Sequence, residues 1–240
     1  RDPEMSRGLG DVYKRQKEVR AGALQSSLSI LLHTHYAIRL WEGRLPGRES
    51  GNVPRIMSMP QAIKRAGGIY RDSQADNPYA DEAMWKVENA INAASEKVHA
   101  LVGWLEQVLC AVPANITMTD VVSRSPLNIG VYSSSPLGYR CVWLLVGYDQ
   151  MALKAFQASH FGLISRQKRD ELLSHGGYLI RKIYGILRGY YAIPVTRQDL
   201  EEKTPAGEQA MARLGLPAAE IMNGQLRSSF SPPLKKKKNK

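Results

Sequence analysis

Two histidines and two tyrosines are the residues of this sequence best suited by type and spacing to catalysis. His33 and His35 are one residue apart, so a strand would place both on one side, where a metal-dependent DNA-nicking enzyme holds its metal ligands. Tyr190 and Tyr191 would then serve as nucleophiles. However, a small residue, Thr34, separates the histidines, and the sequence places no third ligand beside them. We expect the histidines to form hydrogen bonds or contact a partner, and we expect no enzyme activity.

Asp149 is the second candidate, because it interrupts an otherwise apolar helical pattern in the run VGYDQMA. Burying a neutral polar group without a hydrogen bond costs on the order of 2–7 kcal/mol, and burying an unpaired carboxylate costs more. Its position is one step from the apolar seam that includes Tyr148, so we expect the side chain to reach solvent. The alternative is a buried polar network with Tyr148, Gln150 or an arginine.

Basic residues are concentrated between residues 154 and 193, which hold seven basic and two acidic residues. Residues 17–153 are nearly balanced, with thirteen basic and twelve acidic residues. On a helical wheel Arg181 and Arg188 share one face, and the neighbouring apolar residues occupy another that the core would take. This pattern disfavours binding to a membrane surface. The remaining interpretations are an ordinary solvated helix face and a surface that binds DNA phosphates. The candidate phosphate-binding residues are Lys154, Arg166, Lys168, Arg169, Arg181, Lys182 and Arg188.

Composition excludes several classes of protein. The chain has 240 residues, of which 43% are hydrophobic, enough for one sizeable core. Cys110 and Cys141 form no CxxC pair, and no apolar run reaches the ~18 residues that cross a bilayer. The common nucleotide, zinc-protease and hydrolase motifs are absent. We therefore expect a soluble, cytoplasmic protein without cofactor, metal or membrane contact.

The elements that must position these residues are mostly helical. Residues 78–111 carry apolar residues at alternating steps of four and three, and a second helix with this spacing starts after Ser135. We expect these two helices to form an antiparallel hairpin or to pair across a dimer. Shorter helices are expected at 36–43, at 59–75 and throughout the C-terminal quarter. Gly176 and Gly177 are typical of a helix stop, which predicts separate helices at 166–175 and 178–191.

Two segments have the character of strands. Residues 24–33 alternate apolar and polar side chains, and residues 127–133 form a second short β-prone run. The predicted fold class is therefore mainly α with a small β element: a long antiparallel helical hairpin, short helices and one or two strands. Residues 17–231 would form a single domain. Residues 1–16 look derived from a sequencing adaptor and, like the lysine-rich tail at 232–240, are expected to be disordered.

Four runs give the chain a resemblance to a known family. They are GALQSSLSILLHTHYAIRLWEGR at 22–44, DNPYADEAMW at 76–85, SSPLGYRCVWLLVGYDQMALKAFQASHFGLISR at 134–166 and RSSFSPPL at 227–234. Together they resemble the integrating conjugative element proteins related to the AcaB-type transcriptional regulators of conjugation. The likeness extends, in order, over nearly the whole chain after residue 17.

The resemblance implies a transcriptional regulator of transfer genes with a ribbon-helix-helix-like element, in which strands from two subunits pair and read bases in the major groove. The polar face of the first strand offers Gln25, Ser27 and Ser29 as base-reading residues, and the second strand is the alternative. The expected partners are double-stranded DNA, a second copy of the chain and other proteins of the element. A non-catalytic structural protein of the conjugation machinery is the main alternative, and an HUH-like DNA-nicking enzyme the remote one.

Overall fold

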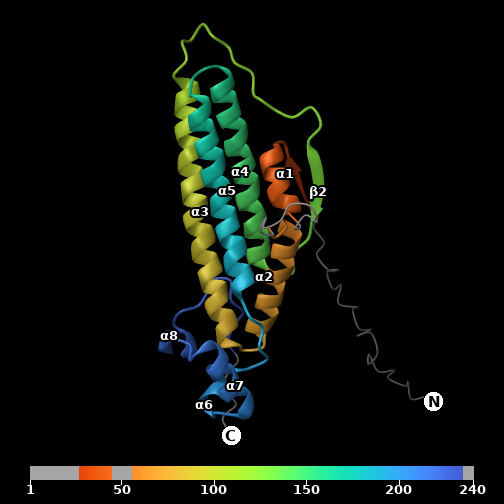
Figure 1. The fold of residues 1–240 in the computed structure, drawn as a ribbon, viewed down its shortest axis with the longest axis vertical. Coiled ribbons are helices and arrows are strands. Elements are labelled where there is room, and N and C mark those ends of the chain that lie inside the picture. Colours follow the sequence, from red (N-terminus) through yellow and green to blue (C-terminus); the bar gives the residue numbers. More distant parts are fainter. Residues whose placement is uncertain (1–26, 45–55, 235–240) are drawn as a thin grey trace, which may run out of the picture.

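Three long helices run side by side along the length of the molecule, and shorter elements cover one side and one end of them (Figure 1). The computed structural model describes residues 27–44 and 56–234. The predicted mainly helical fold with a small β element is confirmed. Gln25, the segment 1–16 and most of the predicted tail at 232–240 lie outside the described residues. The elements are β1 (Leu28–Leu32), α1 (His35–Glu42), α2 (Met59–Gln74), α3 (Pro78–Cys110), β2 (Leu127–Val131), α4 (Pro136–His160), α5 (Arg166–Gly189), α6 (Arg197–Glu201), α7 (Pro205–Leu214) and α8 (Ala219–Met222).

Both α3 and α4 begin where the sequence predicts a helix, and each starts with a side-chain cap. The Asn77 side chain accepts a hydrogen bond from the backbone N–H of Tyr79 at 3.0 Å, and the next residue is a proline. Ser135 caps α4 in the same way and is also followed by a proline. The predicted seam of α3 lies in the core, with Leu101 and Val108 at its half-buried end. Local sequence therefore determines where these two helices begin and which side they bury.

The two long helices pair as predicted, but they run parallel rather than antiparallel. Early in both helices, Arg140 of α4 donates to Asn92 of α3 at 2.7 Å. Late in both, Lys154 of α4 lies 3.1 Å from Glu106 of α3. The predicted direction was wrong because the connection after α3 is long enough to return along the bundle, and its last part is β2 (Figure 1). The antiparallel hairpin of this fold is formed by α4 and α5 instead.

Residues 166–189 form one continuous helix, α5, so the predicted break at Gly176 and Gly177 was wrong. Both glycines are buried in the middle of the helix. A Cβ atom on Gly176 would lie 2.5 Å from the Tyr148 ring of α4. Tyr148 is itself buried, and its hydroxyl donates to the carbonyl of Leu173 at 2.9 Å. The glycines therefore allow α4 and α5 to pack closely and do not end the helix.

The two strands pair with each other within the chain. They are antiparallel, with Ile30 opposite Ile129, Ser29 opposite Gly130 and Leu31 opposite Asn128. Ile30 and Leu32 face the core, and Ser29 and Leu31 are exposed, as the predicted alternation requires. The ribbon is thus made by one chain, whereas the resemblance implied strands from two subunits.

Asp149 is buried, so the prediction that it reaches solvent was wrong. Its carboxylate accepts hydrogen bonds from the backbone N–H groups of His33 and Thr34, at 2.8 and 2.9 Å, and from the Thr34 hydroxyl at 2.6 Å. Thr34 in turn caps the start of α1. The alternative of a buried network is confirmed, although its partners lie at the β1–α1 junction and not among the predicted residues.

We predict that Gly176→Ala lowers the free energy of unfolding by about 1 to 3 kcal/mol, because its methyl group would overlap the buried Tyr148 ring. Gly185→Ala, on the same helix, is the matched control. No atom lies within 4 Å of the added Cβ there, so higher helix propensity should stabilise the protein by about 0.5 to 1 kcal/mol. Urea unfolding followed by circular dichroism measures both changes. Equal effects of the two substitutions would contradict the close packing.

Candidate nucleic-acid interface

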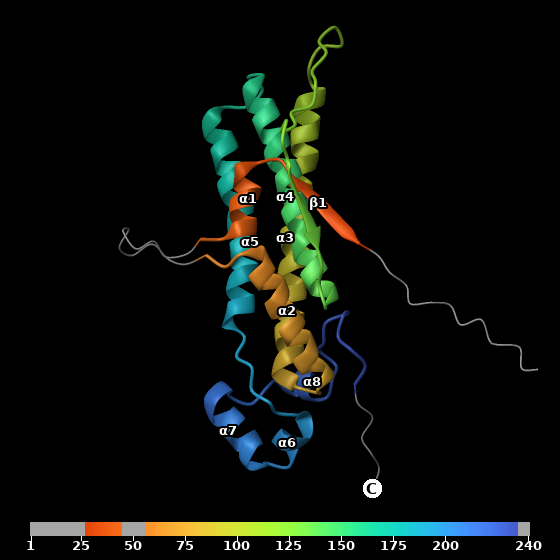
Figure 2. The same cartoon turned by 90° about the vertical axis from the view of Figure 1, so that its right-hand side faces the viewer.

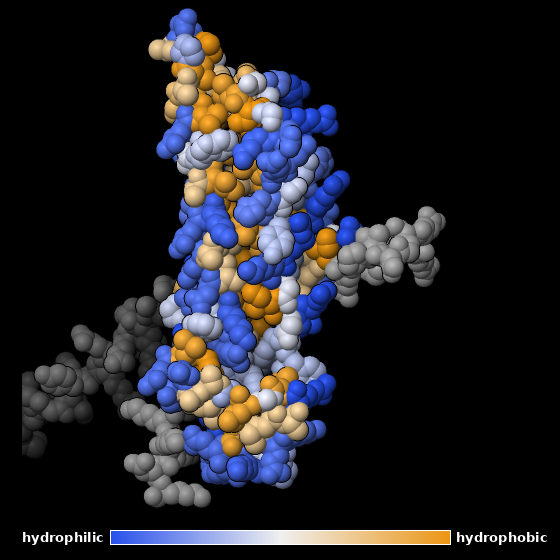
Figure 3. Space-filling model, turned by 60° about the vertical axis from the view of Figure 1, so that its left-hand side comes forward, coloured by the Kyte–Doolittle hydropathy of each residue, from blue (hydrophilic) through white to orange (hydrophobic). Residues whose placement is uncertain are grey.

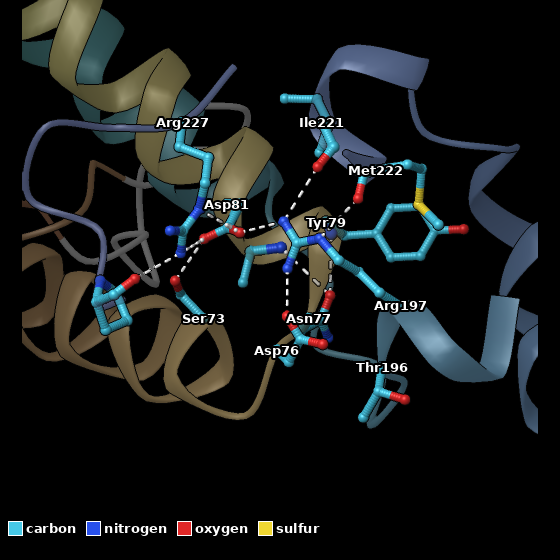
Figure 4. A network of polar contacts seen from close by, with 12 residues as sticks. Ser73, Asp76, Asn77, Tyr79, Asp81, Thr196, Arg197, Ile221, Met222 and Arg227 are labelled. Carbon is cyan, nitrogen blue, oxygen red and sulfur yellow. Dashed lines mark hydrogen bonds and ion pairs between the residues drawn. The ribbon is translucent and has the colours of Figure 1, made fainter. Parts of the chain in front are cut away.

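A buried cluster of charged residues lies where the C-terminal helices meet the corner between α2 and α3 (Figure 4). Asp81 is completely buried and accepts hydrogen bonds from Arg197, from Arg227 at 2.9 Å and from Ser73. Arg197 also donates to Asp76 at 2.6 Å and to the carbonyls of α8. Among the described residues, no buried side-chain nitrogen or oxygen lacks a partner. The cluster is saturated and serves to attach α6–α8 to the bundle.

The geometry gives little support to the histidine and tyrosine chemistry. His33 accepts a hydrogen bond at Nδ1 from the backbone N–H of Ser123 at 3.2 Å, as the prediction of a hydrogen-bonding role expects. Burial and a 2.7 Å hydrogen bond to Asp72 raise the pKa of Tyr190, which opposes its use as a nucleophile. The Arg213 guanidinium lies over the Tyr191 ring, with its Cζ 3.8 Å from the ring centroid. Within the described parts of the chain, no three His, Cys, Asp or Glu residues are grouped to hold a metal ion.

The predicted phosphate-binding cations fall into two groups, at opposite ends of α5. At a rise of ~1.5 Å per residue, Arg166 and Arg188 are roughly 33 Å apart along the helix. Near the start of α5, three cations lie beside carboxylates: Lys154 with Glu106 at 3.1 Å, Lys168 with Glu171 at 3.8 Å and Arg169 with Asp170 at 2.7 Å. Exposed Arg166 borders a hollow that also contains Asp170 and Glu171. This end of α5 is therefore close to neutral.

The other end of α5 is different. Arg181, Lys182 and Arg188 are exposed, and in the part of the chain that the structure describes none of them forms an ion pair. Arg181 and Arg188 line a hollow of about 150 Å³ with Tyr184 and Met57. Their positive charge is thus available to an anionic ligand.

A second set of cations, which the sequence analysis missed, comes from α2. Lys64, Arg65 and Arg71 are exposed and, together with Arg188, line a hollow of about 460 Å³. This hollow shares Met57 and Arg188 with the smaller one, so the two form a continuous depression, named here the α2–α5 groove. No described Asp or Glu lines either part. The seven-residue spacing of Lys64 and Arg71 indicates one helix face, but the balanced charge of residues 17–153 hid this signal.

The chain that leads into α2 is held in place through α1, which contacts α5. The Tyr184 hydroxyl of α5 donates to the carbonyl of Leu40 in α1 at 2.8 Å. Just after α1, Arg44 and Ile56 exchange two backbone hydrogen bonds, at 2.9 and 3.0 Å. Met57 then enters the groove, and Ser58 caps α2 in a capping box with Gln61. The cations of α2 are therefore positioned through α1.

The predicted base-reading residues lie on the outward face of the ribbon. Ser27 and Ser29 are exposed, and Asn128 and Gly130 of β2 are exposed on the same face as Ser29. Figure 2 shows α1 in front of α5 and the ribbon to the right of α1, over α4. The ribbon face and the α2–α5 groove are accordingly separate surfaces.

Apolar side chains are exposed at the end of the molecule opposite α6–α8. Figure 3 shows an apolar area at this end, whereas hydrophilic residues cover much of the visible bundle below it. Three large apolar residues are exposed in the segments that form this end: Trp104, Ile116 and Phe161. None of the described helices is long and apolar enough to cross a membrane.

Comparison with known proteins identifies the fold and the family of this chain. The fold is similar to the crystal structure of selenomethionine-containing AcaB from uropathogenic E. coli, with a TM-score of 0.54 over 84% of this chain and 96% of that one. Sequence identity over this match is 13%. The family model of the transcriptional regulator AcaB matches residues 20–235. The chain therefore belongs to the AcaB family of transcriptional regulators, as the resemblance implied. A search of curated proteins found no match.

We predict that Arg197→Met lowers the free energy of unfolding by about 3 to 5 kcal/mol, because it leaves the buried Asp81 short of one of its two guanidinium partners. Lys182→Met is the control: this exposed residue forms no ion pair among the described residues, so its change should stay within about 0.5 kcal/mol. Thermal unfolding by calorimetry compares the two. A loss for Arg197→Met no larger than for the control would show that the cluster does not stabilise the fold.

Proposed function

We propose that this protein is a DNA-binding transcriptional regulator of conjugative transfer genes in an integrating conjugative element. The observation that carries the proposal is the α2–α5 groove, a depression lined by exposed cations with no described carboxylate among them. The family supplies the regulatory role. The proposed protein acts in the cytoplasm as a homodimer, has no catalytic role and also contacts other proteins of the element.

The groove suits a phosphate backbone for electrostatic reasons. Arginine binds phosphate through two parallel N–H···O hydrogen bonds, and lysine adds a mobile point charge. Cations that are already paired with carboxylates would have to give up those partners, so unpaired ones contribute more to binding. Lys64, Arg65, Arg71, Arg181 and Arg188 are therefore proposed as the principal phosphate contacts. Secondary contacts are proposed for Lys182, for the paired cations Lys154, Lys168 and Arg169, and for Arg166, which lies beside the carboxylates of Asp170 and Glu171.

Sequence recognition requires hydrogen bonds to base edges, which phosphate contacts do not provide. The ribbon face is the proposed source. Ser27 and Ser29 can donate to and accept from bases, and the Asn128 amide on the same face can do both at once. Gln25, which lies outside the described residues, is proposed as a further base-reading residue.

An interaction protein of the transfer machinery is the second candidate. The exposed apolar residues Trp104, Ile116 and Phe161 at one end of the bundle favour it, since exposed apolar patches typically mark protein contacts. This candidate predicts that the purified protein shows no salt-dependent affinity for DNA.

We predict that the triple variant K64Q/R71Q/R188Q binds duplex DNA at least tenfold more weakly at low salt. Each lost phosphate contact should reduce the slope of log K against log salt by about 0.9, so the slope should fall by roughly 2 to 3. The matched control is R166Q/K168Q/R169Q, which removes the same charge from the end of α5 that carries carboxylates. Fluorescence anisotropy at a series of salt concentrations measures the affinity of each variant for DNA. All variants are made in the full chain, so that the lysine tail is the same in each.

The control triple should change affinity and slope much less than the groove triple. Equal losses from both would show that net charge, and not the groove, determines binding. Absence of binding by the unchanged protein at low salt would remove the DNA-binding proposal and favour the interaction protein.

A further inference from the structure

Gly185 is a glycine of α5 that packing does not explain. Inside a helix, glycine is roughly 1 kcal/mol less favourable than alanine, so its presence there usually has a reason. At Gly176 the reason is the Tyr148 ring, which occupies the space of a Cβ atom. Gly185 is exposed, and no atom lies within 4 Å of the position that its Cβ would take. The space beside it is open to solvent, which lets a ligand approach the helix closely.

Two arginines lie on either side of Gly185 along the helix. Arg181 precedes it by four residues and Arg188 follows it by three, which is roughly 6 and 4.5 Å along the axis. All three residues line the hollow of about 150 Å³. Both arginines are exposed, and among the described residues neither forms a hydrogen bond or an ion pair. Both guanidinium groups can therefore reach a ligand that lies over Gly185.

The other walls of this hollow favour a small anion. Ile56 and Met57 are half-buried, and Tyr184 is buried with its hydroxyl already bonded to the Leu40 carbonyl. No described acidic residue lines the hollow. Apolar walls lower the local dielectric constant, which strengthens hydrogen bonds between charged groups. Pockets for whole small molecules measure roughly 300–1,000 Å³, so this smaller hollow suits a single chemical group.

We propose that this hollow, named here the Gly185 site, binds one phosphate group, which lies against Gly185 between the guanidinium groups of Arg181 and Arg188. Arginine binds phosphate through two parallel N–H···O hydrogen bonds. The larger hollow continues from the site and adds Lys64, Arg65 and Arg71. Cations spread along one depression match a ligand that carries several phosphates, one of which occupies the Gly185 site.

The inference deepens the proposed function and rests on it for the source of the phosphate. In a DNA-binding regulator, the group is a phosphodiester of the backbone. The phosphate ester of a small molecule has the same chemistry and would bind in the same place. In either case Gly185 lowers helix stability and leaves room for the ligand, so filling the site should stabilise the fold and weaken binding.

The first test fills the site without changing the charge, using Gly185→Ala and Gly185→Gln in the full chain. Alanine and glutamine are better helix formers than glycine, so the melting temperature should stay equal or rise. Affinity for duplex DNA, measured by fluorescence anisotropy, should fall several-fold for alanine. For glutamine it should fall about tenfold or more, as expected for the loss of a charge-assisted hydrogen bond.

Gly103→Ala and Gly103→Gln are the matched controls. Gly103 lies in α3, no atom is within 4 Å of its added Cβ, and it lines neither hollow of the groove. These variants should bind DNA as the unchanged protein does.

The second test follows the backbone amide of Gly185 by ¹H–¹⁵N NMR spectroscopy of the unchanged protein. Short duplex DNA and inorganic phosphate are added in separate titrations. The Gly185 resonance should shift in both, and the Gly103 resonance should shift in neither. Anions bound only by the lysine tail would leave Gly185 unmoved.

The two tests separate the site from the proposed function. Full DNA affinity in the Gly185 variants, together with an unmoved Gly185 resonance, would overturn the site and leave DNA binding intact. A shift with inorganic phosphate in a protein that binds no DNA would assign the site to a small phosphate ester and contradict only the proposed function. Neither DNA binding nor any shift of Gly185 would overturn both.

Discussion

The carboxylate of Asp149 links most of the surfaces of this molecule. It projects from the middle of α4 and accepts three hydrogen bonds from the β1–α1 junction. It thereby fixes the end of the ribbon and the start of α1. Helix α1 in turn is bound to α5 by the hydrogen bond from the Tyr184 hydroxyl to the Leu40 carbonyl. The β-bridge between Arg44 and Ile56 connects the end of α1 to the start of α2. One buried charge, neutralised by backbone dipoles and a hydroxyl, thus connects the ribbon to the α2–α5 groove.

The parallel arrangement of α3 and α4 explains why the ribbon exists. A chain that leaves the far end of α3 must return before it can begin a parallel helix, and β2 is part of that return (Figure 1). The returning strand pairs with β1, and the paired apolar face packs on α4. With a tight turn after α3, the next helix would have been antiparallel and the space beside α4 would have no strand to fill it.

Local features of the fold could be predicted from the sequence, and features that depend on distant contacts could not. The caps at Asn77 and Ser135 and the seam of α3 follow from neighbours within a few residues. Asp149 finds partners 115 and 116 residues away, and Gly176 owes its role to a ring on another helix. The candidate site follows the same rule. Arg181 and Arg188 were found as one helix face, whereas Lys64 and Arg71 join them only because α2 packs beside α5.

Charge pairing divides the basic region of the sequence into two parts with different properties. Its first cation, Lys154, pairs with Glu106, and the next three share α5 with Asp170 and Glu171, so much of their field is cancelled locally. Its last cations have no such neighbours and gain those of α2, so positive potential is concentrated in one depression. A depression lined by lysine and arginine attracts any phosphate backbone, whatever its bases. Under the proposed function, selectivity would therefore come from a different surface. The ribbon is the proposed one, because its outward residues Ser29, Leu31, Asn128 and Gly130 are exposed and uncharged.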